Sequence, residues 1–131
     1  MSEEASGAPT AYERLGGEAA VRTLVDRFYD LMDLEPGYAR LRAVHPSSLD
    51  GSRDKLFWFL CGWLGGPDHY IERFGHPRLR ARHLPFSIGI AERDQWLACM
   101  HQAMRELGVD ESLADRLAEA FFNTADWMRN R

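Results

Sequence analysis

A short basic segment past the middle of the chain carries the residue types best suited to holding a cofactor. It runs from Gly75 to Phe86 and contains two histidines, three arginines and two prolines, in a chain whose net charge is -4. Pro85 is expected to disfavour an α conformation at Leu84 and to break any helix that reaches it. His83 should therefore lie at the end of a short, poorly helical element, with apolar side chains just beyond it.

This arrangement suits a porphyrin. Haem iron takes an imidazole as an axial ligand, and arginines pair with carboxylates such as the haem propionates. The alternative is that His83 is an exposed loop histidine in a solvated basic turn, because polar residues are usually exposed. The segment alone leaves both interpretations open.

The elements that would position this segment are predicted to be helices. Helical spacing of apolar residues and glycine or proline breaks indicate an all-α fold of five or so helices. We expect Asp50, Gly51 and Ser52 to cap the second long helix and Asp110 to cap the last one. The long helices are expected over residues 18–33, 52–64, 90–107 and 111–127, with short helical segments at 38–44 and 67–74.

Composition limits the chain to one ordinary domain of 131 residues, 45% of them hydrophobic. The negative charge argues against nucleic-acid binding, and no apolar run approaches the roughly 20 residues needed to cross a membrane. Cys61 and Cys99 lack zinc-site spacing, so we expect them to be reduced, buried and cytoplasmic. Residues 1–10 lack the features of a signal peptide and are expected to form a flexible extension, followed by a single domain over 11–131.

An ordered set of motifs along the chain resembles the truncated haemoglobins, and specifically their group II branch. The resemblance extends from Tyr12 to about Trp127 and implies a shortened, all-α globin: a two-over-two arrangement of helices around haem b, with a loose proximal helix. Its most specific pieces are Gly16-Gly17, Phe28-Tyr29, Trp63-Leu64-Gly65-Gly66-Pro67, the basic segment, and Glu92-Arg93-Asp94-Gln95-Trp96-Leu97.

The resemblance assigns roles to five polar or aromatic residues. His83 corresponds to the proximal ligand of the haem iron. Tyr29 and Trp96 correspond to distal hydrogen-bond donors, and His45 would be a third polar group there. Ser52 stands where many globins carry a distal histidine or glutamine.

The resemblance also assigns the walls of the haem site. Apolar residues would line the haem, and three residues with polar groups would contact its propionates. The apolar set is Leu56, Phe57 and Leu60, with Phe86 and Ile88 on the proximal side. The propionate set is Tyr70, Arg80 and Arg82.

These assignments lead to one main hypothesis and two alternatives. The main hypothesis is a cytoplasmic haem protein that binds O2, CO and NO and releases O2 slowly because donors surround it. The first alternative is a redox enzyme, oxidising NO to nitrate or using peroxide. It would need an unknown reductase, because the chain has no dinucleotide motif. The second alternative is a haem-free helical interaction module.

Overall fold

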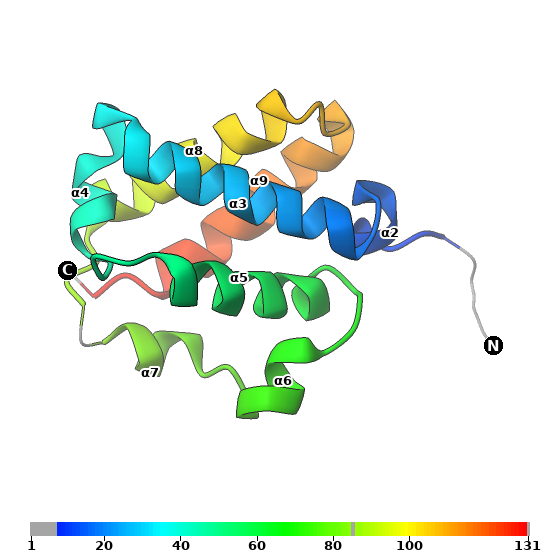
Figure 1. Cartoon of the computed structure of the whole chain (residues 1–131), viewed down its shortest axis with the longest axis horizontal. Coiled ribbons are helices and arrows are strands. Elements are labelled where there is room, and N and C mark those ends of the chain that lie inside the picture. Colours follow the sequence, from blue (N-terminus) through cyan, green and yellow to red (C-terminus); the bar gives the residue numbers. More distant parts are fainter. Residues whose placement is uncertain (1–7, 85, 131) are drawn as a thin grey trace.

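Nine helical segments make up the part of the chain that the computed structural model describes, residues 8–84 and 86–130 (Figure 1). None of these residues lies in a β-strand, which confirms the predicted all-α class. The segments are α2 (Ala11–Leu15), α3 (Glu18–Leu34), η1 (Pro36–Tyr38), α4 (Ala39–Ala43), α5 (Asp50–Trp63), α6 (His69–Phe74), α7 (Leu79–His83), α8 (Ile90–Glu106) and α9 (Glu111–Trp127).

The four long helices form two packed pairs. Helix α3 packs against α5, α8 packs against α9, and α3 also crosses α8. Each contributes an apolar face, as the spacing predicted, and the largest fully buried side chains come from the first three of these helices. They include Phe28, Leu24 and Met32 of α3, Leu60 of α5, and Met100 and Met104 of α8.

The long helices begin and end close to the predicted residues, except at the start of α5. That helix begins at Asp50, and its N-cap residue is Leu49, which makes no side-chain cap. The prediction that residues 50–52 cap this helix is therefore wrong. The Leu49 side chain is buried, and its burial against the core fixes where the helix starts. The cap predicted at Asp110 is confirmed, since its carboxylate accepts a hydrogen bond from Leu113 N–H at 3.2 Å.

Helix α2 is a one-turn element that is tied to the rest of the molecule by its caps and by α5. Thr10 and Glu13 form a reciprocal capping box, and Tyr12 N–H donates to Leu64 O at 2.9 Å. Of the predicted N-terminal extension over 1–10, residues 1–7 lie outside the described residues, whereas Thr10 is part of this cap. Gly16 turns the chain into α3 at φ 118°, a left-handed conformation that suits glycine.

The short helix α7 lies below α5 in Figure 1, and no other helix of the described chain packs closely against it. As predicted, it ends at His83. Leu84, however, adopts α-helical angles (φ -56°, ψ -36°), so the prediction that Pro85 keeps it out of that region is wrong. Hydrogen bonds to the carbonyl of His83, from Phe86 N–H and from the Asn130 side chain, hold this turn and outweigh the local preference. Pro85 lies outside the described residues.

Both cysteines are buried and free, as predicted. Burial raises the pKa of the Cys61 thiol to about 11 and that of Cys99 to about 12. Within the described chain, no helix combines the length and apolar character that a membrane span requires.

Candidate functional site

A cavity of about 470 Å³ opens among the helices and is lined by residues from α3 to α9. Its volume lies within the range of cofactor and small-molecule sites, and its lining is mostly apolar. The structure brings most of the predicted site residues together on its wall. Those on the lining are Tyr29, His45, Ser52, Leu56, Leu60, Tyr70, Arg82, His83, Phe86, Ile88 and Trp96.

Two predicted site residues do not line this cavity. The ring of Phe57 stacks on that of His69 at 6.3 Å and lies under the Arg22 guanidinium. The guanidinium of Arg80 lies 5.0 Å from the ring centroid of Trp127. Both positions adjoin lining residues in sequence, but successive helical residues point about 100° apart, so they face elsewhere.

His83 presents an imidazole to the cavity in a defined orientation. Its Nδ1 lies 2.6 Å from Leu79 O. A carbonyl oxygen only accepts, so Nδ1 carries the hydrogen, and in the neutral ring Nε2 keeps its lone pair. None of the described residues gives Nε2 a hydrogen-bond partner. The ring is thus in the state that metal-ligating histidines adopt, with its second nitrogen fixed by a carbonyl.

Tyr29 brings a buried hydroxyl to the cavity. The side chain is 5% exposed, its ring packs edge-on against Phe28, and the His45 ring lies 5.9 Å away. Burial raises the pKa of the hydroxyl well above its usual value, with a smaller opposing effect from the Arg53 guanidinium. The hydroxyl therefore stays protonated, and no described residue accepts its hydrogen bond. A buried O–H without a partner is uncommon in folded proteins and points to a missing ligand.

Trp96 offers a second donor without a partner. It sits on α8 between the rings of Phe28 (5.1 Å) and Phe121 (5.2 Å), which fix its plane. Its indole N–H makes no hydrogen bond with the described residues. Tyr29 and Trp96 thus bring two unsatisfied donors to one cavity.

His45 has the same local geometry as His83. Its Nδ1 lies 2.9 Å from Leu41 O, so the neutral ring again presents a lone pair at Nε2. Burial lowers the pKa of His45, more than the hydrogen bond to Leu41 raises it. At neutral pH the ring is therefore an acceptor, and it becomes a donor through Nε2 only when protonated.

One part of the cavity wall carries cationic and phenolic groups. The Arg82 guanidinium lies 5.7 Å from the ring centroid of Tyr70, and its Nε donates to Pro77 O at 2.8 Å. Lys55 also lines the cavity, although sequence reasoning missed it. Its position was detectable, because it stands one turn after Ser52 on α5 and so shares that helix face.

Sequence reasoning also missed further lining residues, most of which lie on helices that it predicted correctly. Helix periodicity placed several of them on inward faces without indicating which part of the interior they reach. They are Leu41, Val44, Pro46, Phe59, Trp63, Leu79, Glu92, Arg93, Phe121, Thr124, Ala125 and Met128.

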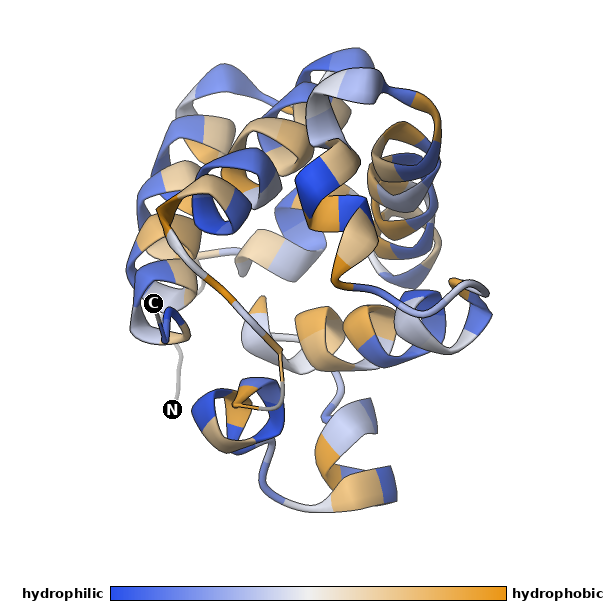
Figure 2. Cartoon of the chain, turned by 90° about the vertical axis from the view of Figure 1, so that its left-hand side faces the viewer, coloured by the Kyte–Doolittle hydropathy of each residue, from blue (hydrophilic) through white to orange (hydrophobic). Residues whose placement is uncertain are grey.

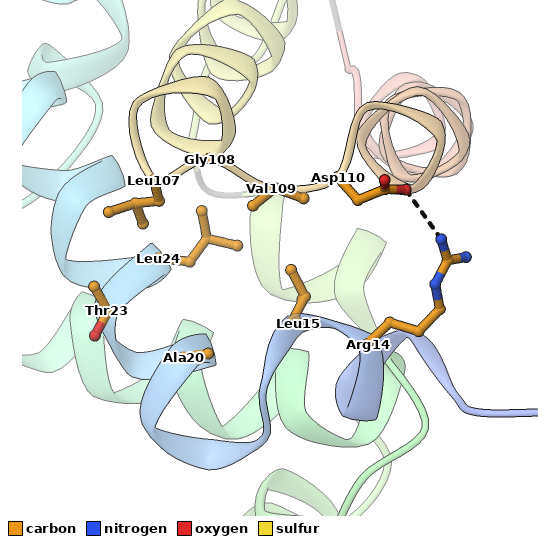
Figure 3. Close-up of a pocket in the computed structure, with 9 residues that line it drawn as sticks. All are labelled: Arg14, Leu15, Ala20, Thr23, Leu24, Leu107, Gly108, Val109 and Asp110. Atoms are coloured by element: carbon orange, nitrogen blue, oxygen red, sulfur yellow. Dashed lines mark hydrogen bonds and ion pairs between the residues drawn. The ribbon is translucent and has the colours of Figure 1, made fainter.

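A second cavity, of about 340 Å³, lies between α2, α3 and the turn from α8 to α9 (Figure 3). Leu15, Leu24 and Val109 contribute its apolar lining, and the ion pair between Arg14 and Asp110, 3.1 Å apart, lies at one side. It contains none of the predicted site residues.

Known proteins are similar to this chain in both sequence and fold. A family model described as bacterial-like globin matches residues 10–130. The group 2 truncated hemoglobin YjbI of Bacillus subtilis (strain 168) is 40% identical over 120 residues, 92% of this chain and 88% of that protein. The group II 2-on-2 hemoglobin from Agrobacterium tumefaciens is 46% identical, with a TM-score of 0.92 over 97% of this chain and 98% of that chain. A truncated oxygen-avid haemoglobin from Bacillus subtilis is 39% identical, with a TM-score of 0.85 over 93% of this chain and 100% of that chain.

The chain therefore belongs to the bacterial-like globin family. Within that family it is a group II truncated haemoglobin, a haem globin with the two-on-two helical fold. This confirms the family and the fold that the sequence motifs implied.

The residues around the larger cavity fit a haem. The His83 imidazole, with a free Nε2, is available as a ligand, and apolar rings and aliphatic side chains supply walls. Arg82 and Lys55 supply cations for carboxylates. The unpartnered hydroxyl of Tyr29 and N–H of Trp96 supply donors for a small ligand.

Proposed function

We propose that this haem globin binds O2, and also CO and NO, in the cavity that His83 and Tyr29 line. The observation that carries the proposal is the Tyr29 hydroxyl, which is buried, protonated and without a partner among the described residues. Haem b, when bound, would be held by His83 and would supply an iron able to bind a diatomic gas. The residues of this chain decide how firmly haem and gas are held.

On the proximal side, His83 acts as the haem ligand. Its Nδ1–H is held by Leu79 O at 2.6 Å, which orients the ring and leaves the Nε2 lone pair free for the iron. Tyr70, Lys55 and Arg82 hold the propionates, because a carboxylate placed beside them finds donors and positive charge. The apolar remainder of the wall excludes water from the macrocycle.

On the distal side, Tyr29 and Trp96 donate hydrogen bonds to the gas. Hydrogen-bond donors in a dry pocket would stabilise negative charge on a bound gas more than they would in water. At about 1–1.5 kcal/mol for each bond, the two donors together slow O2 release by roughly one to two powers of ten. The oxygen avidity named for the Bacillus subtilis relative is consistent with this expectation.

Slow release favours oxygen sensing, or chemistry on the bound ligand, over bulk oxygen transport. We place the protein in the cytoplasm, which is consistent with its two free thiols.

The test is the O2 dissociation rate of the haem-loaded protein, measured by stopped flow. Tyr29→Phe and Trp96→Phe should each speed release by about tenfold, and the double variant should differ from the sum of the two because they share one ligand. Tyr38→Phe is the matched control, since the Tyr38 hydroxyl donates to Gln102 Oε1 at 2.6 Å and does not line the cavity. Rates like wild type in both single variants would refute the distal assignment.

A further inference from the structure

Asn130, near the C-terminal end of the chain, makes four hydrogen bonds to described residues of the segment that joins α7 to α8. Its backbone N–H donates to Ile88 O at 2.8 Å, and its Oδ1 accepts from Ile88 N–H at 2.9 Å. Its Nδ2 donates to Phe86 O at 2.8 Å and to His83 O at 3.3 Å. Sequence reasoning gave this residue no role.

These bonds add to the sparse other support of the segment. Helix α7 has few contacts with the other helices of the described chain; the Arg80 guanidinium lies 5.0 Å from the ring centroid of Trp127, and that of Arg82 lies 5.7 Å from the ring centroid of Tyr70. The helix is preceded by Arg78 at φ 48°, a conformation that non-glycine residues rarely adopt. Beyond the segment, Gly89 N–H donates to Glu92 Oε1 at 2.7 Å and fixes the start of α8. Between these two points, Asn130 connects His83, Phe86 and Ile88 to the end of α9. Figure 1 shows the stretch that follows α9, drawn in red, running toward this segment, and Figure 2 shows the apolar and polar residues of the helices around it from the side.

The side-chain amide of Asn130 contacts the main chain of residues that belong to the cavity wall. Both donor contacts of Nδ2 go to carbonyls of residues that line the larger cavity, His83 and Phe86. The imidazole of His83 is fixed at Nδ1 by Leu79 O. Leu79 therefore orients the ring of His83, while Asn130 holds the main chain of the same residue.

We propose that Asn130 is a positioning residue that sets the location of the proximal ligand His83 relative to the haem; this inference rests on the proposed function. An outer contact of this kind lowers the conformational freedom that haem binding must remove. Removal of an outer partner of the ligating ring itself typically weakens metal binding 10–100-fold; because Asn130 bonds the main chain of His83 and not its ring, its removal should have an effect at the lower end of that range. Asn130 therefore influences haem retention and the iron–histidine bond through His83, although it does not itself line the cavity.

Asn130→Asp separates this role from simple anchoring of the C-terminus. The aspartate keeps an acceptor for Ile88 N–H but has no donor for the carbonyls of His83 and Phe86. The matched control is Asn123→Asp, an exposed asparagine on α9 that makes no side-chain hydrogen bond within the described chain. Asn130→Ala removes all the side-chain bonds.

The experiment uses the full chain loaded with haem and has two readouts: haem transfer to excess apomyoglobin, and the iron–histidine stretching band of the ferrous protein in resonance Raman spectra. Asn130→Asp and Asn130→Ala should lose haem about tenfold faster and show a shifted or broadened band, while Asn123→Asp matches wild type. Wild-type values of both readouts in both Asn130 variants would overturn the proposal.

Failure of the proposed function gives a different result. Wild-type chain that takes up no haem would refute that function. Amide hydrogen exchange at residues 83, 84 and 86–88 would then test whether Asn130 holds this segment in place. Exchange in haem-free Asn130→Asp should be faster there than in wild type and unchanged in α3. Equal exchange of these amides in haem-free Asn130→Asp and in wild type would also overturn the proposal that Asn130 holds the segment.

Discussion

At the residue scale, the same type of hydrogen bond sets the tautomer of two histidines. His45 and His83 each contact the carbonyl oxygen four residues earlier through Nδ1 and turn Nε2 toward the same cavity. The resemblance to truncated haemoglobins implied that both residues belong to the haem site, but the sequence could not predict the tautomer, which depends on which nitrogen reaches a carbonyl. His45 is consequently an acceptor at neutral pH, where sequence reasoning had treated it as a possible donor.

Burial of His45 makes the haem-free protein sensitive to mild acid. In the folded protein, burial lowers the pKa of His45 below about 6.5, the usual value for a histidine in an unfolded chain. Below that pH the unfolded state takes up the proton more readily, so the free energy of unfolding should fall as the pH drops from about 6.5 and level off below the folded pKa. Urea titrations between pH 7 and pH 5 should show this fall.

In the same titrations, His45→Gln should remove much of the fall, whereas His101→Gln, at an exposed position on α8, should keep it. A pH dependence in His45→Gln equal to that of wild type would contradict the assignment.

At the element scale, the glycines that follow α5 let α2 dock closely on the end of that helix. A Cβ placed on Gly66 would lie 2.6 Å from Cδ1 of the Tyr12 ring, closer than real contacts allow. Gly66→Ala should therefore displace Tyr12 and lower the free energy of unfolding by about 1–3 kcal/mol, the usual effect of overpacking. Gly37→Ala is the control, because a Cβ there meets nothing within 4 Å.

Denaturant unfolding of the two variants beside wild type measures this difference. Equal stability of Gly66→Ala and Gly37→Ala would show that α2 does not depend on this close approach. The sequence had predicted only that the glycine pair ends a helix, since it gives no information on which ring approaches from α2.

At the scale of the whole molecule, the features that the sequence predicted are mostly those that obey local rules. Helix periodicity is a property of neighbouring residues, so the long helices, their apolar faces and the short element carrying His83 were all predictable. The residues that were missed or misplaced depend on contacts between distant parts of the chain. Asn130 contacts a segment more than forty positions away, and Phe57 faces His69 and not the cavity.

The molecule as a whole is arranged around one cavity whose two sides are built differently. The side of Tyr29 and Trp96 rests on α3 and α8, which share the main core. The side of His83 rests on α7, which has few contacts with the other helices of the described chain and whose last residue accepts a hydrogen bond from Asn130. We therefore expect the proximal side to be the more sensitive to loss of the cofactor.

If His83 holds haem in this cavity, a hemin titration followed by absorption spectroscopy should show it. Wild type should develop a Soret band that shifts on reduction and again under CO. His83→Ala should bind hemin at least tenfold more weakly, as expected for loss of a metal ligand, while His101→Ala matches wild type. Hemin affinity and spectra of His83→Ala equal to those of wild type would contradict the assignment of His83 as the haem ligand.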